Sequence, residues 1–160
     1  MKPRFSHTSP YDHLAITPRE QERLAELNRT GLLDTQPEPE FDSIVRLAVR
    51  ALKVRMAAVT LVDRDRAWIK SSVGLAGRET PRWQSFCSHA VALDEALVVP
   101  DATLDPRFVD NPSVTDDPHI RFYAAVPLRS SRGYALGTLC AIDPTPRQPS
   151  EDEISVLSDL

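Results

Sequence analysis

The densest apolar pattern in the chain lies between Ile120 and Asp143 and predicts a buried β-hairpin. Its first arm, Arg121 to Leu128, and its second arm, Tyr134 to Ile142, consist mainly of aromatic, aliphatic and small residues. The segment between them, residues 129–133, is polar and ends in glycine, which is typical of a hairpin turn. Because both arms are apolar along most of their length, we expect the hairpin near the middle of a sheet.

Further apolar runs predict the other strands, at Met56 to Val62, Ala67 to Val73 and Ala96 to Val99. Apolar residues at three- and four-residue spacing predict a helix over Pro39 to Lys53 that covers the sheet. Ser85 is a suitable cap for a short helix within the segment Pro81–Ala92. Short turns between successive strands favour antiparallel pairing, so the pattern predicts an α+β fold with helices packed on a central antiparallel sheet.

The segment from Thr103 to Pro118 is rich in aspartate, proline and asparagine and predicts a long surface excursion, with one helical turn at Pro106 to Asp110. Long loops with little secondary structure of their own often form binding sites or lids. We therefore expect a cavity between the sheet and the segments Pro81–Ala92 and Pro100–Pro118.

The helices at the two ends of the chain have narrower apolar stripes. The first begins at a capping box, Thr17 to Glu20, and has only Leu24 and Leu27 as strong apolar residues. The last begins at Ser150, and its apolar stripe runs unfinished to Leu160. Because such stripes suit a helix–helix seam better than a sheet, we expect a homodimer in which the terminal helices pair.

The composition limits the possible classes of protein. The 160 residues suit one domain with a substantial core, and the net charge of −4, with both signs interspersed, argues against a nucleic-acid partner. No apolar run approaches the roughly 20 residues that cross a bilayer, and the N-terminus lacks the apolar stretch of a signal peptide. We therefore expect a cytoplasmic protein with no membrane partner, in which residues 1–16 form a mobile tail.

The only two cysteines, Cys87 and Cys140, are far apart in the sequence, which fits a reducing compartment. Cys87 stands near the start of the short helix, two residues before His89, and a helix N-terminus favours the thiolate. The plainer interpretation is a small buried residue, and Cys140 lies in a predicted core strand. We expect neither a disulfide between them nor a catalytic role, and the histidines and cysteines show no metal-ligand spacing.

A series of short motifs runs through the chain: Leu32–Thr35, Phe86–Ala90, Val99–Ala102, Asp105–Pro112, Arg121–Ala124, Pro127–Leu128 and Leu136–Asp143. Their order and spacing resemble those of GAF domains found in bacterial signalling proteins beside histidine kinase or diguanylate cyclase modules. The resemblance implies a GAF domain over residues 17–160, with a central antiparallel sheet of about six strands, helices against one face and a roofed pocket on the other. It also implies a final helix that continues into a linker or a kinase or cyclase output module.

The implied pocket would bind a small molecule that the sequence does not identify, and any cofactor is likewise unknown. The candidate pocket residues are Phe86, Cys87, His89, Asp101, Phe108, Arg121 and Tyr123. Bilin-binding GAF domains have an adjacent Cys-His pair, but here Ser88 intervenes. Free methionine sulfoxide reductases of this fold use several cysteines in a glycine-rich context, and cyclic-nucleotide GAF domains have an Asn-Lys…Phe…Asp-Glu signature; neither pattern is present.

These observations predict a non-catalytic sensory or regulatory domain that binds a small molecule and signals through its terminal helices. Two alternatives remain open. A dimerisation module would have no ligand-sized cavity, and a thiol-based redox sensor would need an exposed Cys87 with a low pKa.

Overall fold

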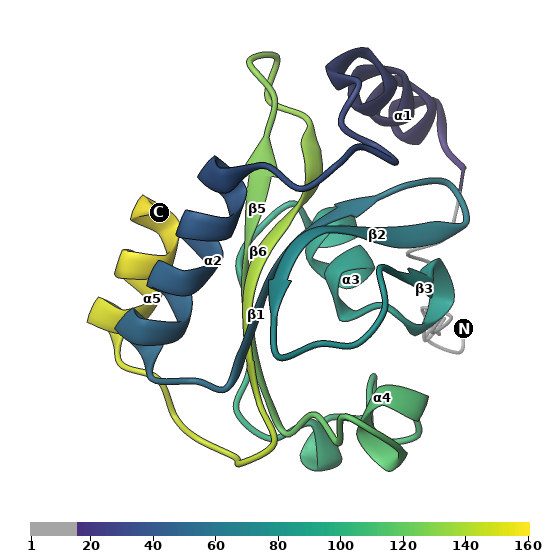
Figure 1. The fold of residues 1–160 in the computed structure, drawn as a ribbon. Coiled ribbons are helices and arrows are strands. Elements are labelled where there is room, and N and C mark those ends of the chain that lie inside the picture. The colour runs from purple at the N-terminus through teal and green to yellow at the C-terminus, as the bar shows by residue number, and fades with distance from the viewer. Residues whose placement is uncertain (1–15) are drawn as a thin grey trace, which may run out of the picture.

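The computed structural model describes residues 16–160, in which a six-stranded sheet is flanked by helices (Figure 1). The strand order is β3-β2-β1-β6-β5-β4 and all neighbouring strands are antiparallel, which confirms the predicted α+β fold. The strands are β1 (Met56–Val62), β2 (Arg66–Val73), β3 (Glu79–Pro81), β4 (Leu97–Val99), β5 (Phe122–Arg129) and β6 (Ala135–Asp143). The predicted hairpin is β5 and β6, and β6 also pairs with β1, so the hairpin lies in the middle of the sheet. The predicted tail lies outside the described residues, apart from Ile16.

The helices are α1 (Pro18–Thr30), α2 (Pro39–Leu52), α3 (Phe86–Leu93), α4 (Pro112–Thr115) and α5 (Glu151–Asp159), with short 3-10 helices η2 (Arg82–Gln84) and η3 (Ala102–Leu104). The hydroxyl group of Thr17 accepts a hydrogen bond from the Glu20 N–H at 3.1 Å, and Ser150 forms a complete capping box with Glu153. The capping residues therefore start both terminal helices where the sequence predicts. Between residues 16 and 160, none of the helices combines the length and the apolar character needed to cross a membrane.

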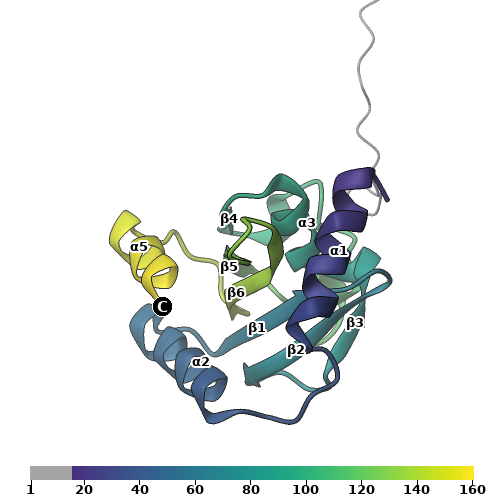
Figure 2. The same ribbon diagram turned by 90° about the horizontal axis from the view of Figure 1, so that it is seen from above.

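The central strands serve two separate cores, because alternate side chains of a strand point to opposite faces of the sheet. On one face, α2 and α5 cover a cluster that includes Val59, Phe122 and Leu139. On the other face, α3 packs over a cluster that includes Tyr123 and Cys140. Figure 1 and Figure 2 show α2 and α5 together on one side of the sheet and α3 on the other.

Two short elements differ from the sequence-based expectation. β3 has three residues and pairs with the beginning of β2, and a strand of this length shows no alternation that could reveal it. The turn expected at Pro106–Asp110 is present, and the N–H of Val109 donates to the carbonyl oxygen of Asp105 at 2.9 Å, but a further short helix forms at α4 that the sequence analysis did not predict. The Asn111 side chain accepts a hydrogen bond from the Ser113 N–H at 2.9 Å, and Pro112 occupies the first helical position, so a capping residue decides where this helix begins.

The terminal helices pack on the sheet and helices of their own chain. Leu27 of α1 is fully buried against Leu61, Trp68 and Leu136, which corrects the expectation that its stripe is too narrow to anchor on a sheet. Leu157 of α5 is fully buried in the core that α2 covers. Pairing of these helices between two copies of the chain remains a prediction.

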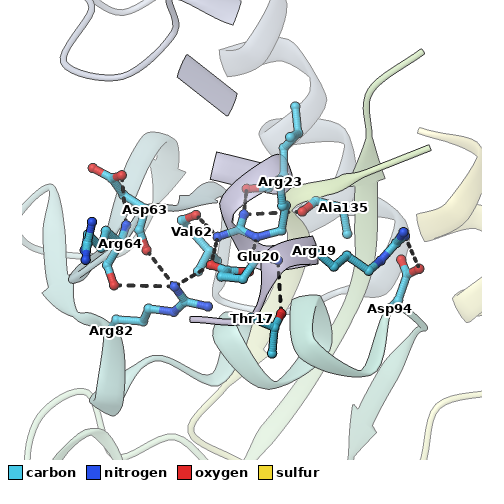
Figure 3. A network of polar contacts seen from close by, with 11 residues as sticks. Thr17, Arg19, Glu20, Arg23, Val62, Asp63, Arg64, Arg82, Asp94 and Ala135 are labelled. Atoms are coloured by element: carbon cyan, nitrogen blue, oxygen red, sulfur yellow. Dashed lines mark hydrogen bonds and ion pairs between the residues drawn. The ribbon is translucent and has the colours of Figure 1, made fainter. Parts of the chain in front are cut away.

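A buried polar network provides a second anchor for α1 (Figure 3). Arg23, which is 5% exposed, donates to the carbonyl oxygen of Val62 at 2.7 Å and to that of Ala135 at 3.3 Å. Glu20, one turn earlier, accepts from Nε and Nη2 of Arg23 and from Nη1 of Arg82, each at 2.7 Å. Glu20 therefore joins α1 to η2, the segment that leads directly into α3.

Candidate functional site

A cavity of about 410 Å³ lies between the α3 face of the sheet and the segments that precede α3 and β5. Its floor is formed by side chains of the four strands β1, β2, β5 and β6, among them Ala58, Thr60, Ile69, Tyr123, Cys140 and Ile142. Ser85, Phe86 and Cys87 form one wall, and Ser113 and Asp117 lie on the side of the long loop. The volume suits a small organic molecule, and the location is the one expected from the sequence.

Phe86, Cys87 and Tyr123 are the candidate residues that line this cavity. Phe108 is fully buried behind Phe86, with the two rings stacked at a centroid distance of 4.0 Å. The His89 ring meets the edge of Phe108 at 4.8 Å and is not part of the lining. Phe108 and His89 therefore support the wall of the cavity from behind.

Asp101 and Arg121 organise the loop and do not line the cavity. The Asp101 carboxylate accepts from the N–H of Thr103 at 3.0 Å and from its hydroxyl group at 2.6 Å, which caps η3. Arg121 donates to the carbonyl oxygen of Val114 at 2.9 Å and to that of Ile120 at 3.0 Å. Their polar groups are used to hold the backbone of the loop between β4 and β5.

The cavity floor contains a cluster of thiol and hydroxyl groups. The Cys87 Sγ atom lies 3.0 Å from the Tyr123 hydroxyl oxygen and accepts a hydrogen bond from the Thr138 hydroxyl group at 3.1 Å. Cys140 belongs to the same core cluster and the same cavity lining as Cys87, and both thiols are free and buried. The fold thus brings together two cysteines that are far apart in the sequence.

The groups around Cys87 act on its ionisation in opposite directions. Hydrogen bonds from Cys140, and then from Thr138 and Tyr123, outweigh burial and lower the pKa of Cys87 to about 6. The same contact with Cys87, together with burial, raises the pKa of Cys140 well above its ordinary value. Burial and the nearby Cys87 also raise the pKa of Tyr123, so that its hydroxyl group stays protonated near neutral pH.

Sequence reasoning missed most of the cavity floor, because Ala58, Thr60 and Ile69 look like ordinary core residues of a strand. The alternation of side chains along β1 could have indicated them, because Ala58 and Thr60 are two residues apart and therefore lie on the same face of the sheet, the face that α3 covers. Asp117 is the one charged side chain in the cavity lining of the described residues. Residues 16–160 also contain no group of three or more His, Cys, Asp or Glu side chains that could hold a metal ion.

Comparison with known proteins yields one curated relative with high similarity. A cyclic di-GMP phosphodiesterase from Pseudomonas aeruginosa is 41% identical over 139 residues, which cover 86% of this chain and 24% of that protein. The chain therefore spans about a quarter of the length of this relative.

Solved structures share the fold at low sequence identity. A free methionine-R-sulfoxide reductase from Thermoplasma acidophilum superposes with a TM-score of 0.63 at 15% identity, over 83% of this chain and 88% of that chain. The GAF domain of a phosphoenolpyruvate-protein phosphotransferase from Acinetobacter gives 0.61 at 18% identity, over 90% and 89%. The fold thus occurs both in an enzyme and in a GAF domain of a larger protein. The sequence profile of the GAF domain matches residues 36–160, and the chain therefore belongs to the GAF domain family, whose members are typically sensory or regulatory.

Proposed function

We propose that this chain is a non-catalytic sensory domain that binds a small molecule in the cavity beneath α3 and signals through its terminal helices. The cavity of about 410 Å³ is the observation that supports this proposal most directly, because a module used only for dimerisation needs no such space. The receiving module would be an enzymatic domain outside this chain, since the 139 residues matched in the Pseudomonas aeruginosa relative are only 24% of that protein.

The cavity lining favours a ligand without phosphate groups. Proteins bind phosphate mainly through Arg and Lys, or through the N–H groups of helix N-termini. At the N-terminus of α3, which lines the cavity, the Cys87 N–H already donates to the Ser85 hydroxyl group at 3.2 Å. No Lys, Arg or His side chain of the described residues lines the cavity, and Asp117 would repel an anion at its rim. We therefore propose an uncharged ligand, and we assign any action on cyclic di-GMP to regions outside this chain.

The route from the cavity to α1 is short. The wall residues Ser85 and Phe86 follow η2 directly, and Arg82 of η2 is bound to Glu20 of α1 at 2.7 Å. A ligand that shifts the wall would also act on this ion pair, because Arg82 is buried and has little freedom to adapt. The network in Figure 3 is therefore our candidate connection between the cavity and the N-terminal helix.

Native mass spectrometry of protein purified from its host tests the ligand proposal. We expect the wild type to retain a non-covalent small molecule, and we expect Ala58→Leu to lose it, because the added side chain occupies the cavity floor. Ala25→Leu makes the same change at an exposed position of α1 and should retain the molecule.

Addition of cyclic di-GMP provides the matching negative control and should leave the melting temperature of the wild type unchanged. Equal occupancy in the Ala58→Leu and Ala25→Leu proteins would contradict the assignment of the cavity. A melting temperature that rises with cyclic di-GMP would contradict the proposed ligand class.

We also propose that the domain forms a homodimer through its terminal helices. Leu24 of α1 is only half-buried within its own chain, so part of its side chain is available to a second copy. In sedimentation experiments we expect a dimer for the wild type and a monomer for Leu24→Glu, whereas Ala25→Glu tests the effect of charge alone. A wild type that stays monomeric at high micromolar concentration would rule out this part of the proposal.

A further inference from the structure

Two features of the thiol pair are not used by a sensor that only binds a ligand. Cys87 is buried and does not have the exposure expected of a simple redox sensor, but both Cys87 and Cys140 line the cavity, so a small solute that enters it reaches both sulfur atoms. The two thiols are also neighbours at the boundary between α3 and β6. The hydroxyl group of Thr138, which precedes Cys140 by two residues on the same face of β6, donates to Cys87 Sγ at 3.1 Å, and the Tyr123 hydroxyl oxygen lies 3.0 Å from the same sulfur atom. Two neighbouring cysteines at a cavity that a small oxidant can enter are the arrangement that formation of a disulfide requires.

The surroundings distinguish the two cysteines. Cys87 occupies the first turn of α3, where N–H groups favour a negative sulfur, and its own N–H is bound by the Ser85 hydroxyl group at 3.2 Å. The Thr138 hydroxyl group donates to the same sulfur atom. Cys140 lies within a central strand and is 1% exposed, compared with 6% for Cys87. Cys87 is therefore the attacking thiol, and Cys140 the one that reacts second.

We propose that Cys87 and Cys140 form a reversible intramolecular disulfide when hydrogen peroxide enters the cavity. The proposal depends on the cavity assigned above, but it does not depend on any organic ligand. Both thiols are free in the structure described, and the expectation from sequence was that the two cysteines form no disulfide. That expectation was based on their distance in the sequence, whereas the structure places both cysteines in the lining of one cavity.

The reaction has two balanced steps. The Cys87 thiolate attacks one oxygen of hydrogen peroxide, the O–O bond breaks, and the leaving hydroxide takes up a proton to become water, which leaves Cys87 as a sulfenic acid. The Cys140 sulfur then attacks the Cys87 sulfur, the S–O bond breaks, and the Cys140 proton leaves with the hydroxyl group as a second water. The thiols lose two electrons to the peroxide, and a dithiol reductant reverses the change.

The disulfide would tie the wall of the cavity to its floor, since Cys87 belongs to α3 and Cys140 to β6. The cavity would become smaller where the two sulfur atoms approach bonding distance. Peroxide would therefore act on the same wall that the proposed ligand contacts.

Quantitative thiol labelling of the full chain, denatured after peroxide treatment, tests the proposal. We expect the wild type to lose both thiols, to remain a single chain on a non-reducing gel and to lose the mass of two hydrogen atoms, with full recovery after dithiothreitol. Cys87→Ser should keep the Cys140 thiol, and Cys140→Ser should yield a Cys87 sulfenic acid that dimedone traps. The rate should rise with pH as Cys87 ionises, at lower pH than for an ordinary thiol, because the surrounding hydrogen bonds lower the pKa of Cys87.

A pair of variants at Thr138 tests the role of the hydroxyl group with little change in shape. Thr138→Val should slow oxidation by about tenfold below neutral pH, the effect of one hydrogen bond to a charged sulfur atom, whereas Thr138→Ser should react at nearly the wild-type rate. Circular dichroism confirms that each variant is folded. A wild type that keeps both thiols under conditions that oxidise free glutathione, or that forms only disulfides between chains, would overturn the proposal. If oxidation fails in this way, retention of the purified small molecule by the wild type would show that the sensory proposal stands while the disulfide proposal does not.

Discussion

Replacing Gly137 by alanine is expected to destabilise the fold severely and to lower the yield of soluble protein. Gly137 lies in β6, where it pairs with Leu61 of β1 on one side and Leu128 of β5 on the other. A Cβ atom at this position would lie 1.9 Å from the carbonyl oxygen of Thr60 and 2.8 Å from the Cα atom of Leu61. Both atoms belong to the backbone of a central strand, so no side-chain rotation can relieve the clash.

The expected cost exceeds about 4 kcal/mol, since β1 and β6 would have to separate in the middle of the sheet. This is a large part of the roughly 5–15 kcal/mol that stabilises a domain of ordinary size. Soluble yield and urea unfolding, followed by tryptophan fluorescence, measure the effect.

Gly133→Ala is the matched comparison for this experiment. Gly133 has a φ of 85°, but no atom lies within 4 Å of its added Cβ, so only the conformational cost of about 1–2 kcal/mol applies. We expect this variant to fold and to unfold at somewhat lower urea concentration. Equal stability of the two alanine variants would show that strand separation at Gly137 is easier than the geometry indicates.

Glu20→Gln is expected to destabilise the protein by about 3–5 kcal/mol, the usual cost of removing one partner from a buried ion pair. The Glu20 carboxylate is the acceptor for both Arg23 and Arg82, whose side chains are 6% and 3% exposed. An amide of the same shape removes the negative charge and leaves two positive groups close together in a buried site. We therefore expect α1 to detach more readily than the rest of the fold.

Urea unfolding measures the total loss, and hydrogen exchange of residues 18–30 measures the release of α1. Glu22→Gln is the control, because Glu22 is exposed and its contact with Tyr134 survives in an amide. The control should change stability by less than about 0.5 kcal/mol. A Glu20→Gln protein as stable as this control would mean that the network contributes nothing to the anchoring of α1.

The same network predicts a dependence of stability on pH. Burial raises the pKa of Glu20, but the hydrogen bonds and charges of Arg23 and Arg82 outweigh it and hold the pKa below its ordinary value. A carboxyl group whose pKa is lower in the folded state stabilises the fold at pH values above its unfolded pKa. This contribution is lost as the pH falls through the folded pKa, and the Glu20→Gln protein should lack that part of the acid sensitivity.

Regular elements could be predicted from the sequence because each has a local cause. The limits of β1 follow from a continuous apolar run, and those of α1 and α5 from their capping residues. The position of α1 on the sheet has no such local cause. It depends on Arg23, which can be buried because it donates to backbone carbonyl oxygens of two distant strands. No local pattern marks an arginine that will become part of the interior.

The candidate site was predictable in location and only partly in composition. Phe86, Cys87 and Tyr123 line the cavity because their segments face one another across it, whereas Asp101 and Arg121 are used by the loop itself. Loop residues of this kind look like ligand-binding groups in a sequence, although aspartate and arginine side chains also hydrogen-bond to the backbone of turns and loops. The contact between Cys87 and Cys140 arises from tertiary structure and has no signal in their spacing.

The two cores of the sheet have a consequence for how this domain can diversify. Ala58, Tyr123 and Cys140 face the cavity, while their immediate neighbours in the strands, such as Val59, Phe122 and Leu139, face α2 and α5. Mutations of the residues that face the cavity can therefore change its shape and polarity, while the alternate residues of the same strands keep their packing against α2 and α5. The side chains that line the cavity and those that pack on α2 and α5 can thus change almost independently, although both are encoded in the same few strands.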